Sequence, residues 1–174
     1  MRRRPLRFDP VAEARRNWVN NGWGDAADGM ALVTSVMRVH QILLARVDEA
    51  LAPLGLTFAR YEVLMLLTFS RVGRLPLGKI GQRLQVHPAS VTNVIDRLEA
   101  DGMVQRRPHP SDMRTTLAAI TAKGRRTGLR ATDVLNGEVF TQVGLKPSAL
   151  EDLFDSLADL RHAAGDFEIL PPGL

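Results

Sequence analysis

The segment from Leu75 to Gly124 reads LPLGKIGQRLQVHPASVTNVIDRLEADGMVQRRPHPSDMRTTLAAITAKG. Its pattern predicts a short helix, a tight turn, a second helix, a strand, a charged loop, a second strand and the start of another helix. This order is typical of a winged helix-turn-helix, in which one helix enters a DNA groove and a β-hairpin lies beside it. We therefore expect the flanking segments to form a frame that holds two such units together.

The second helix of this segment, Pro88–Ala100, is predicted to expose a polar face. His87 would be its N-cap, and Gln85–Val86 would form the turn before it. The apolar residues between Val91 and Leu98 fall within about 100° of arc and would face the core. The opposite arc carries short polar side chains that could read base edges, although an ordinary solvated face would look the same. Its residues are Ala89, Ser90, Thr92, Asn93, Asp96 and Arg97.

A basic hairpin is predicted after this helix. Met103–Arg106 and Met113–Ile120 have extended patterns, and the prolines of Pro108–Asp112 require a loop between them. Thr121 is the expected N-cap of the next helix. A polar helix beside a basic hairpin suits a duplex, with the helix in the major groove and a wing arginine at the minor groove or the phosphates. The basic residues of the hairpin and of the following helix start are Arg106, Arg107, Arg114, Lys123, Arg125 and Arg126.

Two further helices are predicted in the N-terminal part. Asp9 and Pro10 provide an N-cap and a proline at the first helical position, and Trp18 is the expected anchor of this short helix. A longer helix over about 28–52 carries an apolar stripe with spacings of three and four residues. Residues 1–8 are expected to be a disordered basic arm.

The lead into the winged unit contains one more helix. Thr57 is its expected N-cap, and residues 58–69 form its leucine-rich body. Residues 71–74 are predicted to be a turn.

The last third of the chain is predicted to be helical up to residue 166, followed by a loose tail over 167–174. Pro147 indicates the start of the final helix, while Ser148 and Glu151 match a capping box that would place the start slightly later. The apolar stripe of this helix is Leu150, Leu153, Phe154, Leu157 and Leu160.

The cysteine content, the charge distribution and the apolar runs of the chain exclude several classes of protein. The chain has no cysteine, which excludes disulfides, thiolate nucleophiles and cysteine-ligated zinc. Residues 131–174 carry a net charge of −6 and the first 130 residues carry +10, so the basic part is the one expected to meet a polyanion. No apolar run approaches the ~20 residues that are needed to span a bilayer, and no apolar signal segment follows the basic start. We therefore expect a cytoplasmic protein without a membrane partner.

At the wing, the sequence resembles the MarR family of bacterial transcriptional regulators. Asp112–Arg114, Ile120–Thr121 and Lys123–Gly124 match the D-x-R wing, its second strand and the following T-x-x-G helix start. Ser90–Asn93 and Asp96–Gly102 match the recognition helix and the turn beyond it. The resemblance implies a homodimer in which helices 30–52 and 122–164 interleave. It also implies that Arg114 enters the minor groove and that Asp112 orients it.

The N-terminal helix resembles a branch of this family that senses urate and related aromatic metabolites. Trp18 and Arg106 match the ligand set of that branch, whereas Glu62 and Val94 replace its aspartate and its second arginine. The resemblance implies an effector pocket, and the alternative is that Trp18 only anchors its helix. The expected lining residues are Trp18, His40, Tyr61, Glu62 and Arg106.

The sequence therefore predicts a mainly α protein with a small β-hairpin wing. Its parts would be N-terminal dimerisation helices over 9–56, a winged helix-turn-helix over 57–121 and C-terminal dimerisation helices over 122–166. The expected partners are double-stranded DNA, a second copy of the chain and a small-molecule effector, with no cofactor, no metal and no catalytic residue. A winged helix used only for protein contacts, without ligand control, is the alternative. The expected DNA contacts are His87, Ala89, Ser90, Thr92, Asn93, Arg97, Arg106, Arg107, Asp112, Arg114, Lys123 and Arg125.

Overall fold

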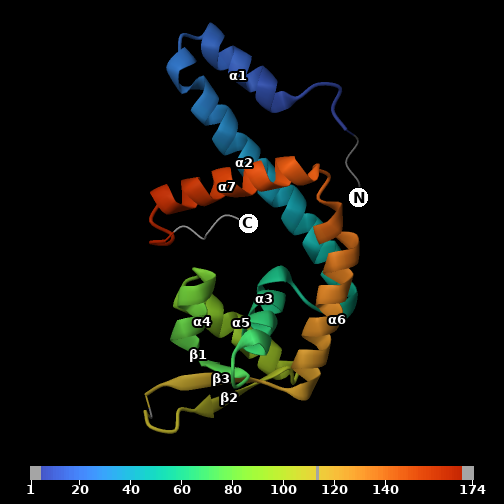
Figure 1. The fold of residues 1–174 in the computed structure, drawn as a ribbon, viewed down its shortest axis with the longest axis vertical. Helices are drawn as coiled ribbons and strands as arrows, with labels where there is room; N and C mark the ends of the chain where they lie inside the picture. Colours follow the sequence, from blue (N-terminus) through green and yellow to red (C-terminus); the bar gives the residue numbers. More distant parts are fainter. Residues whose placement is uncertain (1–4, 113, 170–174) are drawn as a thin grey trace. The chain divides into compact units, whose positions relative to one another are not determined.

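The computed structural model describes residues 5–112 and 114–169. The chain forms two compact units, one up to Val47 and one from Asp48 onward. Helices dominate, and a small antiparallel sheet lies in the second unit, which confirms the predicted fold class (Figure 1). In chain order the elements are α1 (Pro10–Asn20), α2 (Gly24–Leu51), η1 (Ala52–Leu54), α3 (Phe58–Phe69), β1 (Arg74–Pro76), α4 (Leu77–Leu84), α5 (Pro88–Ala100), β2 (Val104–Pro108), β3 (Thr116–Ile120), α6 (Ala122–Glu138), η2 (Phe140–Gln142) and α7 (Pro147–Ala163).

The first unit contains α1 and most of α2. The predicted N-cap of α1 is confirmed, because the backbone N–H of Val11 donates to Asp9 Oδ1 at 2.9 Å and Pro10 occupies the first turn. Trp18 packs edge-on against Trp23, with ring centroids 5.3 Å apart. Trp18 is therefore held within its own unit by a second tryptophan. The basic arm predicted over 1–8 lies outside the described residues up to residue 4, and residues 5–8 are exposed.

The long helix α2 begins at Gly24 rather than near residue 28. The turn before it closes at Gly22, whose φ is 84°, so the helix can start as soon as that turn ends. Many apolar side chains of α2 are exposed to solvent. They are Leu32, Val33, Val36, Met37, Val39, Ile42 and Leu44.

The segment Gly24–Leu54 is long enough, and with a hydropathy of 1.3 apolar enough, to cross a membrane. The prediction that no apolar run is long enough missed this segment. Polar residues such as Thr34, Arg38 and His40 divide it into short apolar runs, while its averaged hydropathy still reaches the level of a membrane helix. Length and composition alone do not separate such a helix from one whose apolar face packs on another protein surface.

The N-terminus of α3 is capped differently from the prediction. Among the described residues, the Thr57 side chain makes no cap hydrogen bond, although its backbone is extended as an N-cap requires. Instead, the backbone N–H of Phe58 donates to Asp48 Oδ1 at 3.0 Å. The carboxylate of Asp48, near the end of α2, therefore accepts a hydrogen bond at the start of α3 in place of the Thr57 hydroxyl.

The sheet has the strand order β1-β3-β2, and both pairs are antiparallel. The predicted hairpin is confirmed as β2 and β3, but β1 is a third strand whose first residue, Arg74, was assigned to a turn. Leu75 pairs with Ala118 across β1 and β3. Pro108 was predicted to lie in the loop, yet it is the last residue of β2, opposite Thr116. Proline is tolerated there because β2 is an edge strand, which needs no N–H on its outer side.

The helix-turn-helix follows the prediction closely. Gln85 ends α4 in the left-handed conformation, with φ of 52°. His87 caps α5, because its Nδ1 accepts a hydrogen bond from the backbone N–H of Ala89 at 3.2 Å. The inner face of α5 is buried through Val91, Ile95 and Leu98, as predicted.

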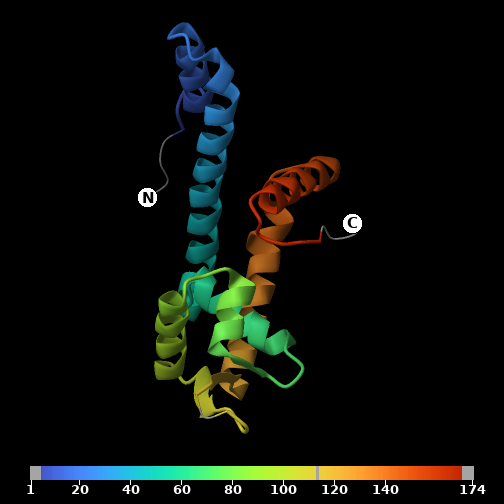
Figure 2. The same ribbon diagram turned by 90° about the vertical axis from the view of Figure 1, so that its left-hand side faces the viewer.

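The helix α6 leaves the sheet directly after β3 (Figures 1 and 2). Its predicted cap is confirmed, because Thr121 Oγ1 accepts from the backbone N–H of Gly124 at 3.0 Å. The last helix, α7, begins at Pro147, so the later start is wrong. Lys146 is its N-cap residue, and no side-chain cap bond from it occurs in the described part of the chain. A proline at the first position presets the helical φ and has no N–H that needs a partner, which favours a start at Pro147.

The predicted loose tail is partly ordered. The Phe167 ring lies 5.6 Å from the His162 ring, and the Arg161 guanidinium lies 5.4 Å from the Phe167 centroid. Residues 170–174 of the predicted tail lie outside the described residues.

Candidate nucleic-acid interface

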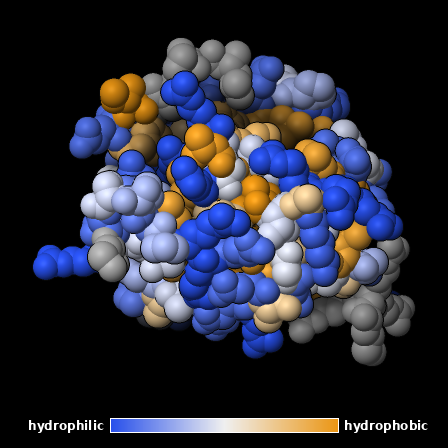
Figure 3. Space-filling model, turned by 90° about the horizontal axis from the view of Figure 1, so that it is seen from below, coloured by the Kyte–Doolittle hydropathy of each residue, from blue (hydrophilic) through white to orange (hydrophobic). Residues whose placement is uncertain are grey.

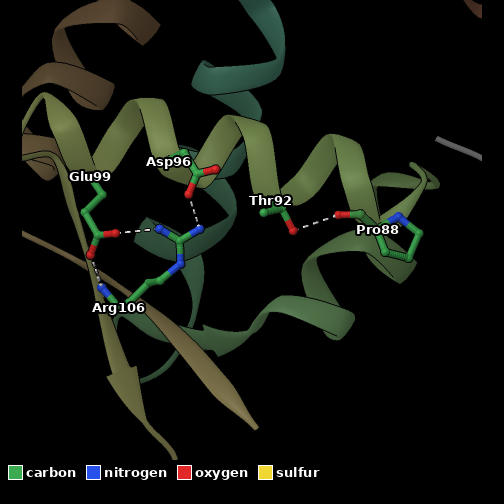
Figure 4. A network of polar contacts seen from close by, with 5 residues as sticks. All are labelled: Pro88, Thr92, Asp96, Glu99 and Arg106. Atoms are coloured by element: carbon green, nitrogen blue, oxygen red, sulfur yellow. Dashed lines mark hydrogen bonds and ion pairs between the residues drawn. The ribbon is translucent and has the colours of Figure 1, made fainter.

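The polar face predicted on α5 is exposed. Thr92 Oγ1 donates to the Pro88 carbonyl oxygen at 3.2 Å, so its hydroxyl proton is occupied while its lone pairs stay available (Figure 4). Hydrophilic side chains cover much of the surface seen from below, the side on which β2 and β3 lie (Figure 3). The exposed residues of the α5 face are Ala89, Ser90, Thr92, Asn93, Asp96 and Arg97.

The wing tip is built around Asp112. Its Oδ2 accepts from Thr115 Oγ1 at 2.6 Å, and its Oδ1 accepts from the backbone N–H of Arg114 at 3.0 Å. These two hydrogen bonds lower the pKa of the Asp112 carboxyl. Asp112 thus fixes the main chain at Arg114, and the Arg114 side chain is exposed beyond it.

A cleft of about 670 Å³ lies between the wing tip and α4. Arg114 and His109 line it from the wing, and Lys79 and Gln82 line it from α4. Gln82 also borders a second cleft, of about 540 Å³, whose other wall includes Thr92 of α5. The wing tip, α4 and α5 therefore open onto adjoining hollows of one surface.

Lys79 is a residue of this surface that is not among the contacts predicted from the sequence. A single lysine on a short helix carries no motif, and only the folded wing brings Arg114 to the same cleft. Its one available signal was its position in the first turn of the helix before the recognition helix.

Several predicted contact residues already bond to the protein itself. Arg106 lies between two carboxylates of α5, and Arg107 Nη2 donates to Gln105 Oε1 at 3.0 Å. Lys123 Nζ donates to the carbonyl oxygen of Asp101 at 2.7 Å. In the same helix start, Arg125 donates to the Thr68 carbonyl oxygen at 3.2 Å. These side chains brace the domain in the free protein, and their DNA contacts remain predictions.

The predicted effector residues are divided between the two units. Trp18 and His40 belong to the first unit, whereas Tyr61, Glu62 and Arg106 belong to the second. The buried Tyr61 hydroxyl lies 3.1 Å from the hydroxyl oxygen of Thr132. Burial raises the pKa of the half-buried Glu62 carboxyl. Within residues 5–112 and 114–169, no cluster of three or more histidine, aspartate or glutamate side chains could hold a metal ion.

Together, the capped recognition helix, the preceding α4 and the arginine-tipped hairpin define a winged helix-turn-helix DNA-binding domain. The sequence model of the MarR family matches residues 56–116. The HTH-type transcriptional repressor Rv2887 of Mycobacterium tuberculosis is 33% identical over 109 residues, which make up 63% of this chain and 77% of that protein.

Solved structures agree with this assignment. Sco5413, a MarR family transcriptional regulator from Streptomyces coelicolor, is 50% identical with a TM-score of 0.75, over 82% of this chain and 99% of that chain. CouR from Rhodococcus jostii RHA1, bound to p-coumaroyl-CoA, is 25% identical with a TM-score of 0.66, over 81% of this chain and 95% of that chain. The chain belongs to the MarR family and is a DNA-binding transcriptional regulator.

Proposed function

We propose that the protein is a cytoplasmic homodimeric repressor, which binds a pseudo-palindromic operator and is released by a small aromatic or anionic ligand. The observation that carries DNA recognition is the single surface formed by α4, α5 and the wing tip. The exposed face of α5 offers hydroxyl, amide and guanidinium groups for base edges, while Arg114 and Lys79 flank it with positive charge. Repressor function is supported by relatives that carry this name.

The apolar residues left exposed on α2 and α7 support a dimer. On α7, Leu153 is 44% exposed and Leu160 is 51% exposed, although both belong to one apolar stripe. Stripes of this kind mark surfaces that pack against another protein. Two recognition helices in such a dimer would read half-sites about 34 Å apart.

Ligand control rests on a comparison and on chemistry. CouR is a structural relative whose structure contains p-coumaroyl-CoA, an aromatic and anionic compound. Within the second unit, Tyr61 and the half-buried Glu62 are the residues proposed to meet a ligand. A panel of phenolic and aromatic carboxylic acids should contain a compound that raises the melting temperature and releases DNA. If none of them changes either quantity, the proposed ligand control is refuted.

Duplex binding is tested by gel shift over a range of salt concentrations. Affinity should fall steeply as salt rises, because several lysine and arginine contacts displace counterions. Arg114→Ala should weaken binding about tenfold or more and reduce the salt slope by about one. Arg130→Ala, which removes an exposed charge from α6, is the matched control and should leave both unchanged. A winged helix used only for protein contacts would show no steep salt dependence, and unchanged binding of Arg114→Ala would refute the wing assignment.

A further inference from the structure

Arg106 of β2 is clamped by two carboxylates of the recognition helix α5 (Figure 4). Its Nη1 donates to Glu99 Oε2 and its Nη2 donates to Asp96 Oδ1, each at 2.5 Å. Asp96 and Glu99 are three residues apart on the helix, so both side chains lie on the side that faces β2. One guanidinium therefore bridges two successive turns of α5.

Glu99 holds the main chain of β2 as well. Its Oε1 accepts from the backbone N–H of Arg106 at 2.8 Å. Since β2 is an edge strand, this N–H would otherwise point to solvent, where edge strands are prone to unwanted pairing. Both hydrogen bonds from Arg106 lower the pKa of the Glu99 carboxyl. The clamp thus fixes the backbone of the wing and one of its side chains to the same helix.

The Arg106 guanidinium is poorly placed to contact DNA directly. Its side chain is 27% exposed, whereas that of Asp96 beside it is 59% exposed. A phosphate that approached the guanidinium would therefore meet the carboxylate of Asp96 and that of Glu99 at close range. Like charges at such distances repel, which disfavours a phosphate at this position.

We propose that Arg106 is a positioning residue, which braces the wing against the recognition helix so that Arg114 and the exposed face of α5 engage one duplex together. This inference rests on the proposed DNA-binding surface. It replaces a direct DNA contact of Arg106 with an indirect one, made through the orientation of α5 and β2. Wild-type affinity then depends on the two carboxylates, even though they are negative charges near a polyanion.

One double substitution should change the DNA affinity in opposite directions for the two possible roles of Arg106, a direct DNA contact and a brace. Asp96→Ala combined with Glu99→Ala removes two negative charges and frees the guanidinium. If Arg106 were a DNA contact, this variant would bind more tightly. If Arg106 is a brace, the variant should bind about three- to tenfold more weakly. The probes are a 30-base-pair duplex selected from a random library by the wild-type protein and a mixed-sequence duplex of the same length.

The coupling between the residues gives a second criterion. Arg106→Ala should weaken binding by a smaller factor than the double variant, because Glu99 still accepts from the backbone N–H at this position. It should have no further effect in the double variant, where the carboxylates that hold its guanidinium are absent. The salt slope of Arg106→Ala should match that of the wild type, since no phosphate contact is lost. Arg107→Ala is the comparison, because it removes the same charge from the next position. If Arg107 contacts a phosphate, as predicted, the salt slope of this variant's DNA affinity should fall by about one. Tighter binding of the double variant, or an undiminished effect of Arg106→Ala within it, would overturn the proposal.

A measurement without DNA separates failure of the brace from failure of the DNA-binding surface. In the free protein, the backbone N–H of Arg106 should exchange slowly with solvent, and Glu99→Ala should accelerate this exchange at least tenfold while the melting temperature shows that the fold persists. Rapid exchange in the wild type would refute the brace even if DNA binding is normal. Slow exchange in a protein that binds no duplex would refute the proposed surface and leave the brace intact.

Discussion

A β-carbon on Gly124 would lie 2.1 Å from the carbonyl oxygen of Met103. The same oxygen accepts hydrogen bonds from the backbone N–H and the hydroxyl of Thr121, at 3.0 and 3.1 Å. The start of α6 therefore lies in close contact with Met103, the residue that precedes β2. Only glycine fits at this contact, because the obstructing atoms belong to the main chain and cannot rotate away.

Gly124→Ala should destabilise the protein by about 3 kcal/mol, since α6 must move off the wing to admit the methyl group. Gly137→Ala is the matched control within the same helix. Apart from its chain neighbours and the backbone of α6 itself, no described atom lies within 4 Å of a β-carbon at Gly137. This substitution should therefore stabilise by about 0.5–1 kcal/mol through helix propensity. Urea denaturation of both variants measures the difference, and equal effects would contradict the contact.

Lys79→Ala should weaken duplex binding and reduce the salt slope by about one, because Lys79 lines the cleft that Arg114 closes from the wing. Lys146→Ala removes an exposed lysine at the start of α7 and should leave the slope unchanged. The measurement is fluorescence anisotropy of a labelled duplex at several salt concentrations. Identical slopes for Lys79→Ala and the wild type would exclude Lys79 from the interface.

Glu62 should make stability depend on pH in an unusual direction. Burial raises its pKa, so the folded state resists charging this carboxyl. The cost is present above the folded-state pKa and disappears as the pH falls below about 4, the ordinary range of a glutamate. Glu62→Gln should therefore raise the melting temperature by about 1–3 °C at pH 7 and have little effect near pH 4.

The control for this measurement is Glu49→Gln, which changes an exposed carboxylate in α2. It should leave the melting temperature unchanged at both pH values. A lower melting temperature of Glu62→Gln at pH 7 would show that the charged carboxylate is stabilised by a partner instead.

The apolar stripe of α7 should hold two copies together. Leu153→Glu places a charge in the stripe at a side chain that is 44% exposed, so it should dissociate the dimer at micromolar concentration while leaving the helix content intact. Ser148→Glu adds the same charge on the opposite side of the helix and should preserve the dimer. Sedimentation velocity distinguishes the two, and a wild-type monomer would contradict the proposed assembly.

Local signals in the sequence were sufficient for most of the fold. His87, Thr121 and Asp9 cap their helices as predicted, because an N-cap bond reaches only two or three residues along the chain. β1 could not be found in this way, since three residues carry little periodicity and the strand exists only through its pairing with β3. Thr57 is the N-cap residue of α3 as predicted, but the side-chain hydrogen bond comes from Asp48. Local signals could not show this bond, because Asp48 lies ten residues before Phe58.

The same limit applies to the candidate site. The exposed face of α5 follows from helical periodicity, which needs no knowledge of the tertiary structure. The clamp on Arg106 joins a strand to the preceding helix, and its only sequence signal is the spacing of Asp96 and Glu99. That spacing places two carboxylates on one side of α5. Which arginine contacts them depends on the path of the chain between α5 and β2, which the sequence pattern does not show.

β3 borders both other strands and continues through Thr121 into α6. The backbone N–H of Ile120 also donates to the carbonyl oxygen of Gly73, 2.9 Å away, just before β1. The segment that leads into α4, the hairpin and the start of α6 are thus all connected to β3. Because α6 begins directly after β3, these connections couple the orientation of α6 to that of the hairpin and of α4.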